Sequence, residues 1–146
     1  LAGKSAQLAD VAGFYAAFGL GPADARPDME DHIGAELEFM SALALKEAWA
    51  IGVADREGEE VTRRAQVTFL GDHLGRWVET FADEVLAATP LPYYAAAAEL
   101  LRAWVRAEIE ALGASPTTLS ARLARDPLQE DSFTCPMAGP APPEPP

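Results

Sequence analysis

Two short stretches of the sequence bring acidic residues and histidines close together. The candidate site residues are Glu30, Asp31, His32 and Glu36 in the first stretch, and Asp72, His73, Arg76 and Trp77 in the second. Carboxylate and imidazole groups are common metal ligands, and carboxylates also form paired hydrogen bonds with the guanidinium group of arginine. These residues could therefore form either a metal site or a site that binds a basic peptide.

A metal site is considered first, because helical bundles can hold two metal ions between facing helices. Such sites need a glutamate three residues before a histidine on each of two helices. Here Met29 stands three residues before His32. Leu70 stands three residues before His73, so the required spacing is absent twice. His32 and Glu36 could share a metal, but two ligands do not complete a site, and we expect no metal.

Nucleophilic catalysis is also weakly indicated. The one cysteine, Cys135, lies close to a proline-rich end, whereas a catalytic thiol needs a partner base and a rigid frame. No glycine-rich phosphate loop of standard spacing occurs. We expect neither an enzyme nor a cofactor. The alternative is a metal- or haem-binding helical-bundle enzyme that uses His32, Glu36, His73 or Cys135.

A basic-peptide site has more support from the distribution of charged and aromatic residues. Acids cluster along two predicted helices, at Asp28, Glu30, Asp31, Glu36 and Glu38 and at Asp72, Glu79, Asp83 and Glu84. The apolar residues of the same helices are Phe39, Met40, Phe69, Trp77 and Phe81. An apolar groove rimmed with acids would suit a segment that has arginines followed by apolar residues. On spacing alone, however, a core of aromatic residues and a solvated acidic face are favoured.

The composition excludes several classes of partner. The 146 residues carry a net charge of -12, and nucleic acid binding needs an excess of Lys and Arg that this chain lacks. No apolar run approaches the roughly 18 residues of a membrane span, so no stable membrane insertion is expected. A single cysteine permits no internal disulfide, which favours a reducing compartment, and no signal peptide is visible. The chain begins with Leu1, so we expect an amino-terminal part of the domain to be missing.

Hydrophobic periodicity predicts an all-α fold. The predicted helices cover residues 5–18, 27–55, 59–88, 93–112 and 115–125. Pro27 would begin the second helix, because proline pre-sets the backbone of a first turn. The acids of that turn would be Asp28, Glu30 and Asp31. Two apolar stripes predict that this helix is covered on more than one side, and they consist of Ile33, Leu37, Met40, Ala44 and Ala48, and of Phe39, Leu43 and Ala50.

The two later helices carry clear start and stop signals. The apolar stripe over residues 59–88 consists of Val67, Leu70, Leu74, Trp77, Phe81 and Val85. Gly71 and Gly75 interrupt it, and such glycines usually let another helix or a ligand approach the backbone. In the following helix, Thr89 would cap and Pro90 would take the first position, while Gly113 would end it. Its predicted buried residues are Tyr94, Ala97, Leu101, Trp104, Ile109 and Leu112.

The chain is predicted to divide into an all-helical domain over residues 1–125 and an extended tail over residues 126–146. The last seven residues contain five prolines and no aromatic residue, which predicts a disordered, proline-rich end. The predicted architecture of the domain is a single helical bundle with short connections.

Three segments carry a family resemblance. They read FYAAFG over residues 14–19, RPDMEDHIGAELEFM over residues 26–40 and FLGDHLGRW over residues 69–77. In this order and at helix-long separation, they are similar to the TorD/DmsD/NarJ family of molybdoenzyme maturation chaperones. The resemblance covers about residues 11–112, and the family's amino-terminal helices have no counterpart before Leu1.

The resemblance implies an all-helical cytoplasmic chaperone. Its partner would be the apo-molybdoenzyme catalytic subunit of a dimethyl-sulfoxide reductase type enzyme, or the leader peptide of that subunit, often a twin-arginine signal peptide. Binding would last until the molybdenum cofactor is inserted. Members of the family can exchange helical segments, so the resemblance also leaves a homodimer by helix exchange open.

The resemblance assigns peptide-binding roles to both stretches. The signature loop, implicated in leader binding, matches Glu30, Asp31 and His32, and the second signature matches Asp72, His73, Arg76 and Trp77. Structural roles stay open beside these. His32 could cap a helix, and Asp72 and Arg76 could form an ion pair four residues apart. Trp77 could lie in the core.

Overall fold

The structure is a computed structural model that describes residues 2–21 and 30–119, with the side chains from residue 6 onward. Its elements are α1 (Ala2–Ala17), α2 (Ile33–Gly52), α3 (Arg56–Phe69), a π-helical turn η1 (Leu70–Leu74), α4 (Gly75–Ala88) and α5 (Pro92–Leu112). Over these ranges the chain forms helices and turns without a strand, so the prediction of an all-α fold is confirmed. The predicted proline-rich tail lies outside the described residues.

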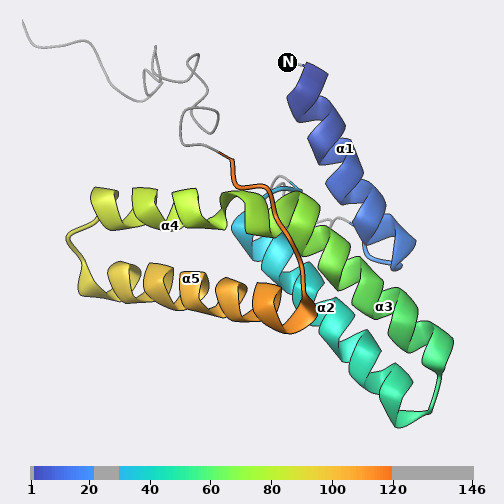
Figure 1. Cartoon of the computed structure of the whole chain (residues 1–146). Helices are drawn as coiled ribbons and strands as arrows, with labels where there is room; N and C mark the ends of the chain where they lie inside the picture. Colours follow the sequence, from blue (N-terminus) through green and yellow to red (C-terminus); the bar gives the residue numbers. More distant parts are fainter. Residues whose placement is uncertain (1, 22–29, 120–146) are drawn as a thin grey trace, which may run out of the picture.

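The helices form two packed pairs (Figure 1). α2 packs along α3, and α4 packs along α5. Residues 56–88 are helical without a break, but the chain changes direction at η1, so that α4 does not continue the axis of α3. In the part of the chain that the structure describes, no helix is both long and apolar enough to cross a membrane.

The core lies where α1, α2, α3 and η1 meet. Its centre is formed by two fully buried rings, Phe39 on α2 and Phe69 on α3, whose centroids are 4.7 Å apart. The other buried apolar residues of this cluster are Val11, Met40, Leu43, Ala65, Leu70, Leu74, Val78, Val105 and Ala114. Because this cluster includes residues of every helix, it connects both helix pairs to α1.

The start of α2 differs from the prediction. The helix begins at Ile33 rather than Pro27, because His32 has an extended backbone and its ring nitrogen Nδ1 accepts a hydrogen bond from the Gly34 amide at 3.1 Å. His32 is therefore the N-cap residue, and Glu30 and Asp31 lie in the turn before the helix. Pro27 and Asp28 lie outside the described residues. The carboxyl-terminal end is at Gly52, three residues before the predicted end.

One of the two predicted apolar stripes of α2 is buried along its length, and the other is buried only in its first half, up to Met40. Phe39, Leu43 and Ala50 are buried, as expected. Ala44 and Ala48, from the other stripe, are exposed, and nearby Trp49 is 66% exposed. The prediction that α2 is covered on more than one side is therefore wrong for its carboxyl-terminal half within the described residues.

The predicted helix over residues 59–88 is divided by the π-turn. It starts at Arg56, where Asp55 Oδ1 accepts a hydrogen bond from the Gly58 amide at 3.0 Å. A Cβ atom at Gly75 would run into the carbonyl oxygen of Leu70 and would lie 3.1 Å from Pro116. The predicted close approach is thus correct for Gly75. It is wrong for Gly71, where a Cβ atom would meet nothing within 4 Å.

These two glycines provide a matched pair of substitutions. We expect Gly75→Ala to lower the free energy of unfolding by about 1–3 kcal/mol, because the added methyl group must displace the π-turn carbonyl of Leu70. Gly71→Ala should leave stability unchanged or raise it by up to about 1 kcal/mol, because alanine is the better helix former. Urea unfolding of both variants checks this difference. Equal effects of the two substitutions would contradict the close packing at Gly75.

The boundaries of α5 are partly as predicted. Gly113 ends the helix with a left-handed backbone (φ 73°). The helix begins with Pro92 rather than Pro90, because Thr89 Oγ1 accepts a hydrogen bond from the Leu91 amide at 3.2 Å and holds the preceding residues in an extended turn.

The buried side of α5 was predicted with errors at three positions. Ala98 and Val105 are buried, and Leu101, Ile109 and Leu112 pack partly buried against the core. The wrong predictions are Tyr94, Ala97 and Trp104, which are exposed. They are wrong because the face that meets α4 is centred on the two small buried residues rather than on the large aromatic ones.

A non-helical segment after α5 packs along α4. The helix predicted over residues 115–125 does not form over residues 115–119, and residues 120–125 lie outside the described part. Instead the Leu119 amide donates to the Arg76 carbonyl at 2.8 Å, and Thr80 Oγ1 donates to the Leu119 carbonyl at 3.3 Å. The segment is coloured orange in Figure 1. It closes over Gly75 at the start of α4.

Candidate functional site

The two candidate stretches meet in space. Glu36 lies in the first turn of α2, and Trp77 lies in the first turn of α4, 41 residues later. The indole Nε1 of Trp77 donates to both carboxyl oxygens of Glu36, at 3.3 Å each. This contact joins the start of α2 to the start of α4, close to the turn that carries Glu30 and Asp31.

Glu36 is a buried acid rather than a surface carboxylate. Its side chain is only 1% exposed. Burial raises the pKa of Glu36 to about 8, the Trp77 hydrogen bond lowers it in part, and the neighbouring Asp31 raises it. The neutral form therefore predominates at neutral pH. In this conformation Glu36 is buried in the first turn of α2, next to the turn of Glu30 and Asp31, and its carboxyl group is not accessible to a ligand.

Tyr15 on α1 holds the other side of the turn. Its hydroxyl donates to the carbonyl oxygen of Glu30 at 2.8 Å. Burial raises the pKa of Tyr15 far above its usual value, and the nearby Glu36 and Asp31 raise it further. Tyr15 was absent from the predicted site. The signal that could have found it is the FYAAFG segment, which precedes the acidic stretch and forms part of the family resemblance.

The turn presents its polar groups at the surface. Glu30 and Asp31 are half-buried and His32 is exposed. The His32 ring is used as the helix cap, so the structural role left open for it is confirmed. Neither Glu30 nor Asp31 forms an ion pair with another described residue. The backbone of the turn is fixed by the Tyr15 hydrogen bond to the Glu30 carbonyl and by the His32 cap of α2, and both carboxylates are partly exposed to solvent.

His73 points into the core instead of toward the turn. It is 2% exposed and lies between the rings of Phe14 and Phe69, with centroids 5.3 and 5.1 Å away. Its Nε2 lies 3.2 Å from Oδ2 of Asp10 on α1. Burial lowers the pKa of His73, and this effect outweighs the opposite effect of Asp10. His73 is thus a neutral contact between η1 and α1.

Arg76 and Asp72 do not form the ion pair that their spacing allows. The Arg76 guanidinium donates instead to the backbone carbonyl of Asp72, at 3.3 Å, and to that of Thr117, also at 3.3 Å. Arg76 therefore binds the segment after α5. The Asp72 side chain is exposed.

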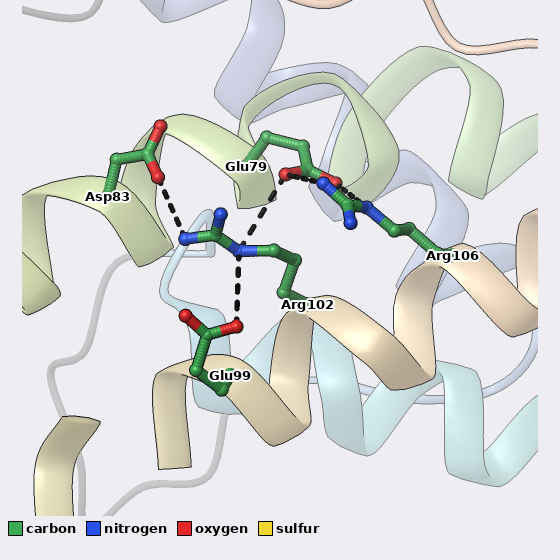
Figure 2. Close-up of polar contacts among 5 residues, drawn as sticks. All are labelled: Glu79, Asp83, Glu99, Arg102 and Arg106. Atoms are coloured by element: carbon green, nitrogen blue, oxygen red, sulfur yellow. Dashed lines mark hydrogen bonds and ion pairs between the residues drawn. The ribbon is translucent and has the colours of Figure 1, made fainter. Parts of the chain in front are cut away.

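Two acids of α4, Glu79 and Asp83, are paired with arginines of the chain itself (Figure 2). The guanidinium of Arg106 makes two hydrogen bonds to the carboxylate of Glu79, at 2.5 and 2.8 Å. Arg102 donates to Asp83 at 2.8 Å. These pairs connect α5 to α4. They withdraw Glu79 and Asp83 from the acidic surface that the sequence indicated, whereas Glu30, Asp31, Glu38 and Asp72 form no ion pair with another described residue.

The predicted apolar groove between the two acidic helices is wrong. Phe39, Met40 and Phe69 are 1%, 2% and 0% exposed, so they form core under α1, as spacing alone favoured. Trp77 and Phe81 are half-buried and touch edge to face, with centroids 5.4 Å apart. A groove fails to form because α1 supplies the aromatic side chains that fill it.

The described residues also contain no group of three or more His, Cys, Asp or Glu side chains placed to hold a metal ion. Cys135 lies outside the described part of the chain. The candidate site therefore contains two partly exposed carboxylates, Glu30 and Asp31, close to the buried acid Glu36. Carboxylates of this kind can pair with a cationic group.

Comparison with known proteins gives one family and two relatives. The family described as nitrate reductase delta subunit matches residues 1–83. A perchlorate reductase assembly chaperone protein of Dechloromonas aromatica is 33% identical over 103 residues, which are 70% of this chain and 45% of the relative. A chaperone protein TorD of Photobacterium profundum is 35% identical over 74 residues, 51% of this chain and 33% of the relative. The chain thus spans less than half the length of these relatives, and no solved structure matches it significantly.

Proposed function

The chain belongs to the nitrate reductase delta subunit family of TorD- and NarJ-type proteins, and from this premise we propose that it is an assembly chaperone for a partner oxidoreductase. The partner is a molybdoenzyme of the dimethyl-sulfoxide reductase type. The chaperone binds the amino-terminal leader of its catalytic subunit in the cytoplasm and releases it after the cofactor is inserted. The names of the two relatives, both chaperones, support this proposal.

The observation that carries the proposal is the turn of Glu30 and Asp31. Its two carboxylates are partly exposed, and the backbone that carries them is held by the Tyr15 hydrogen bond to the Glu30 carbonyl and by the His32 cap of α2. Guanidinium groups pair with carboxylates through two parallel hydrogen bonds, which a flexible acidic surface would form less well. A leader with adjacent arginines supplies the matching groups.

The net charge of the chain assists the encounter. At -12, the protein attracts a basic segment from beyond contact distance and raises its association rate at low salt. Final selectivity comes from the fixed carboxylates, because long-range attraction acts equally on any basic peptide. While the chaperone covers the arginines, the export machinery cannot read them. A homodimer by helix exchange stays a prediction that is separate from this binding mode.

Co-purification tests the proposed client. The tagged full chain is expressed in cells that produce a reductase of this type, and the proteins retained with it are identified by mass spectrometry. We expect a reductase catalytic subunit that still carries its leader. A version of that subunit without its leader should be lost from the complex. Retention of the leaderless subunit at the same level would contradict leader binding.

A further inference from the structure

α1 is attached to the rest of the protein by side chains. Its fully buried residue is Val11, and Phe14, Tyr15 and Phe18 are partly buried against the core. Between described residues, no backbone–backbone hydrogen bond joins α1 to another element. The polar contacts of α1 are those of Tyr15 with the Glu30 carbonyl and of Asp10 with His73.

The surface beneath α1 is aromatic and well defined. We name it the α1 seat, and it consists of Phe39, Phe69 and His73. Phe14 of α1 contacts all three rings, with centroids 6.3, 5.5 and 5.3 Å away. Tyr15 lies 4.9 Å from the Phe39 ring. Without α1, these otherwise buried groups would form an open apolar surface.

The spacing of the α1 contacts shows which ligand the seat accepts. Residues 11, 14, 15 and 18 follow the i, i+3, i+4, i+7 pattern by which an amphipathic helix lies in an apolar groove. The seat also borders the acidic turn, because Tyr15 contacts Phe39 and the Glu30 carbonyl at once. A ligand helix placed there would have its end next to the carboxylates of Glu30 and Asp31.

α1 is also a weak helix on its own. It contains Gly3 and Gly13. Each glycine weakens a helix by about 1 kcal/mol relative to alanine. The stability of α1 therefore depends on the seat, so we expect α1 to open locally at a lower cost than the paired helices α2 to α5.

We propose that the α1 seat is the docking surface for an amphipathic helical segment of the partner, and that α1 occupies it in the free protein. This inference rests on the proposed function, and it adds the apolar part of the ligand to the arginines already proposed. The partner segment has apolar residues at i, i+3, i+4 and i+7, next to arginines that reach the turn of Glu30 and Asp31. Binding of the segment displaces α1.

The proposal predicts that a substitution which loosens α1 raises the affinity for the leader rather than lowering it. If only the fraction of molecules with α1 displaced can bind, apparent affinity rises with that fraction. Phe14→Ala removes the ring that contacts the whole seat and favours displacement. Its affinity for the leader should therefore rise, by about tenfold. If α1 were instead part of the binding surface, the same substitution would lower affinity.

Calorimetric titration with a synthetic leader peptide, two arginines followed by an apolar segment, measures this effect. Val105→Ala is the matched control, because it removes a fully buried side chain of the same core that lies on α5, outside α1 and the α1 seat. We expect tighter binding by Phe14→Ala and unchanged binding by Val105→Ala. Unchanged or weaker binding by Phe14→Ala overturns the proposal. Circular dichroism establishes that both variants are folded.

A second experiment tests whether the α1 seat binds an amphipathic helix, independently of whether the leader is the ligand. A synthetic peptide of residues 2–20 is added to the Phe14→Ala protein, and hydrogen exchange is followed by mass spectrometry. We expect the peptide to slow exchange around Phe39 and Phe69 while exchange of the resident α1 becomes faster. If this peptide binds and the leader does not, leader binding is refuted, but the α1 seat is still shown to bind an amphipathic helix. If neither binds, or if resident α1 is protected with the rest, the docking surface is refuted.

Discussion

Replacement of Glu36 by glutamine should make the protein more stable at pH 9 by a few kcal/mol and change its stability little at pH 4. Glutamine keeps the shape of the side chain and can still accept a hydrogen bond from Trp77. In the wild type, burial raises the pKa of Glu36 from 4.5 to about 8. At pH 9 the folded protein must bury a charge there, and the variant need not.

The direction of this pH dependence follows from proton binding. Between about pH 4.5 and pH 8 the folded state holds a proton on Glu36 that the unfolded chain has lost. Raising the pH across this window therefore lowers the free energy of unfolding. Each pKa unit corresponds to about 1.4 kcal/mol, so the rise from 4.5 to about 8 gives a total loss on the order of 5 kcal/mol. Below this window, wild type and variant should be nearly equal.

Urea unfolding at pH 4, 7 and 9 measures this difference. Glu38→Gln is the control, because Glu38 is an exposed acid on the same helix. The control should keep the wild-type dependence on pH, whereas Glu36→Gln should be less dependent on pH. Parallel pH profiles for wild type and Glu36→Gln would show that the carboxyl group is not buried as described.

The second large effect concerns ligand binding. We expect the double variant Glu30→Gln, Asp31→Asn to bind a twin-arginine leader ten- to a hundredfold less tightly, which is about 1.4–2.7 kcal/mol. The reason is loss of both carboxylates that can pair with guanidinium groups at the turn. The folded structure should be retained, because neither side chain carries a contact that holds the turn. Tyr15 contacts the Glu30 backbone, which the substitution leaves in place.

A charge-matched control separates local pairing from general attraction. Glu57→Gln, Glu110→Gln also removes two negative charges, from exposed positions on α3 and α5. It should weaken binding by less than about threefold at physiological salt, where exposed charges are largely screened beyond a Debye length. Isothermal titration of both variants with one peptide makes the comparison. Equal losses of affinity in the two double variants would show that the turn contributes no more to peptide binding than other acids on the surface.

The helices were predictable because their signals are local. Apolar spacing located the helices of the described part, although it joined α3 and α4 into one, and Gly113 marked the end of α5 correctly. The start of α2 was placed at Pro27 because proline followed by acids is a common signal for a first turn, whereas histidine is outside the preferred cap types, although capping by His32 had been left open. The π-turn was missed because nothing in the spacing of Leu70 and Leu74 distinguishes it from an ordinary turn. The residue that approaches the end of this turn, at Gly75, is Pro116 on a distant segment.

The site was harder to predict because acids on helices look alike in sequence. Glu36 and Glu38 are two residues apart, yet one is buried and the other exposed. The difference depends on Trp77, 41 residues away. The pairing of Glu79 and Asp83 with arginines had a visible signal, since Arg102 and Arg106 repeat the same spacing of four. This matching spacing predicts the ion pairs only when α4 and α5 are known to be neighbours.

The central claim is that the turn of Glu30 and Asp31 grips arginines of a leader peptide. Calorimetric titration of the wild-type chain with a leader peptide, and with the same peptide after both arginines are replaced by glutamine, tests it most directly. We predict micromolar or tighter binding of the first peptide, about -8 kcal/mol, and at least tenfold weaker binding of the second. Equal affinity for the two peptides would contradict the claim.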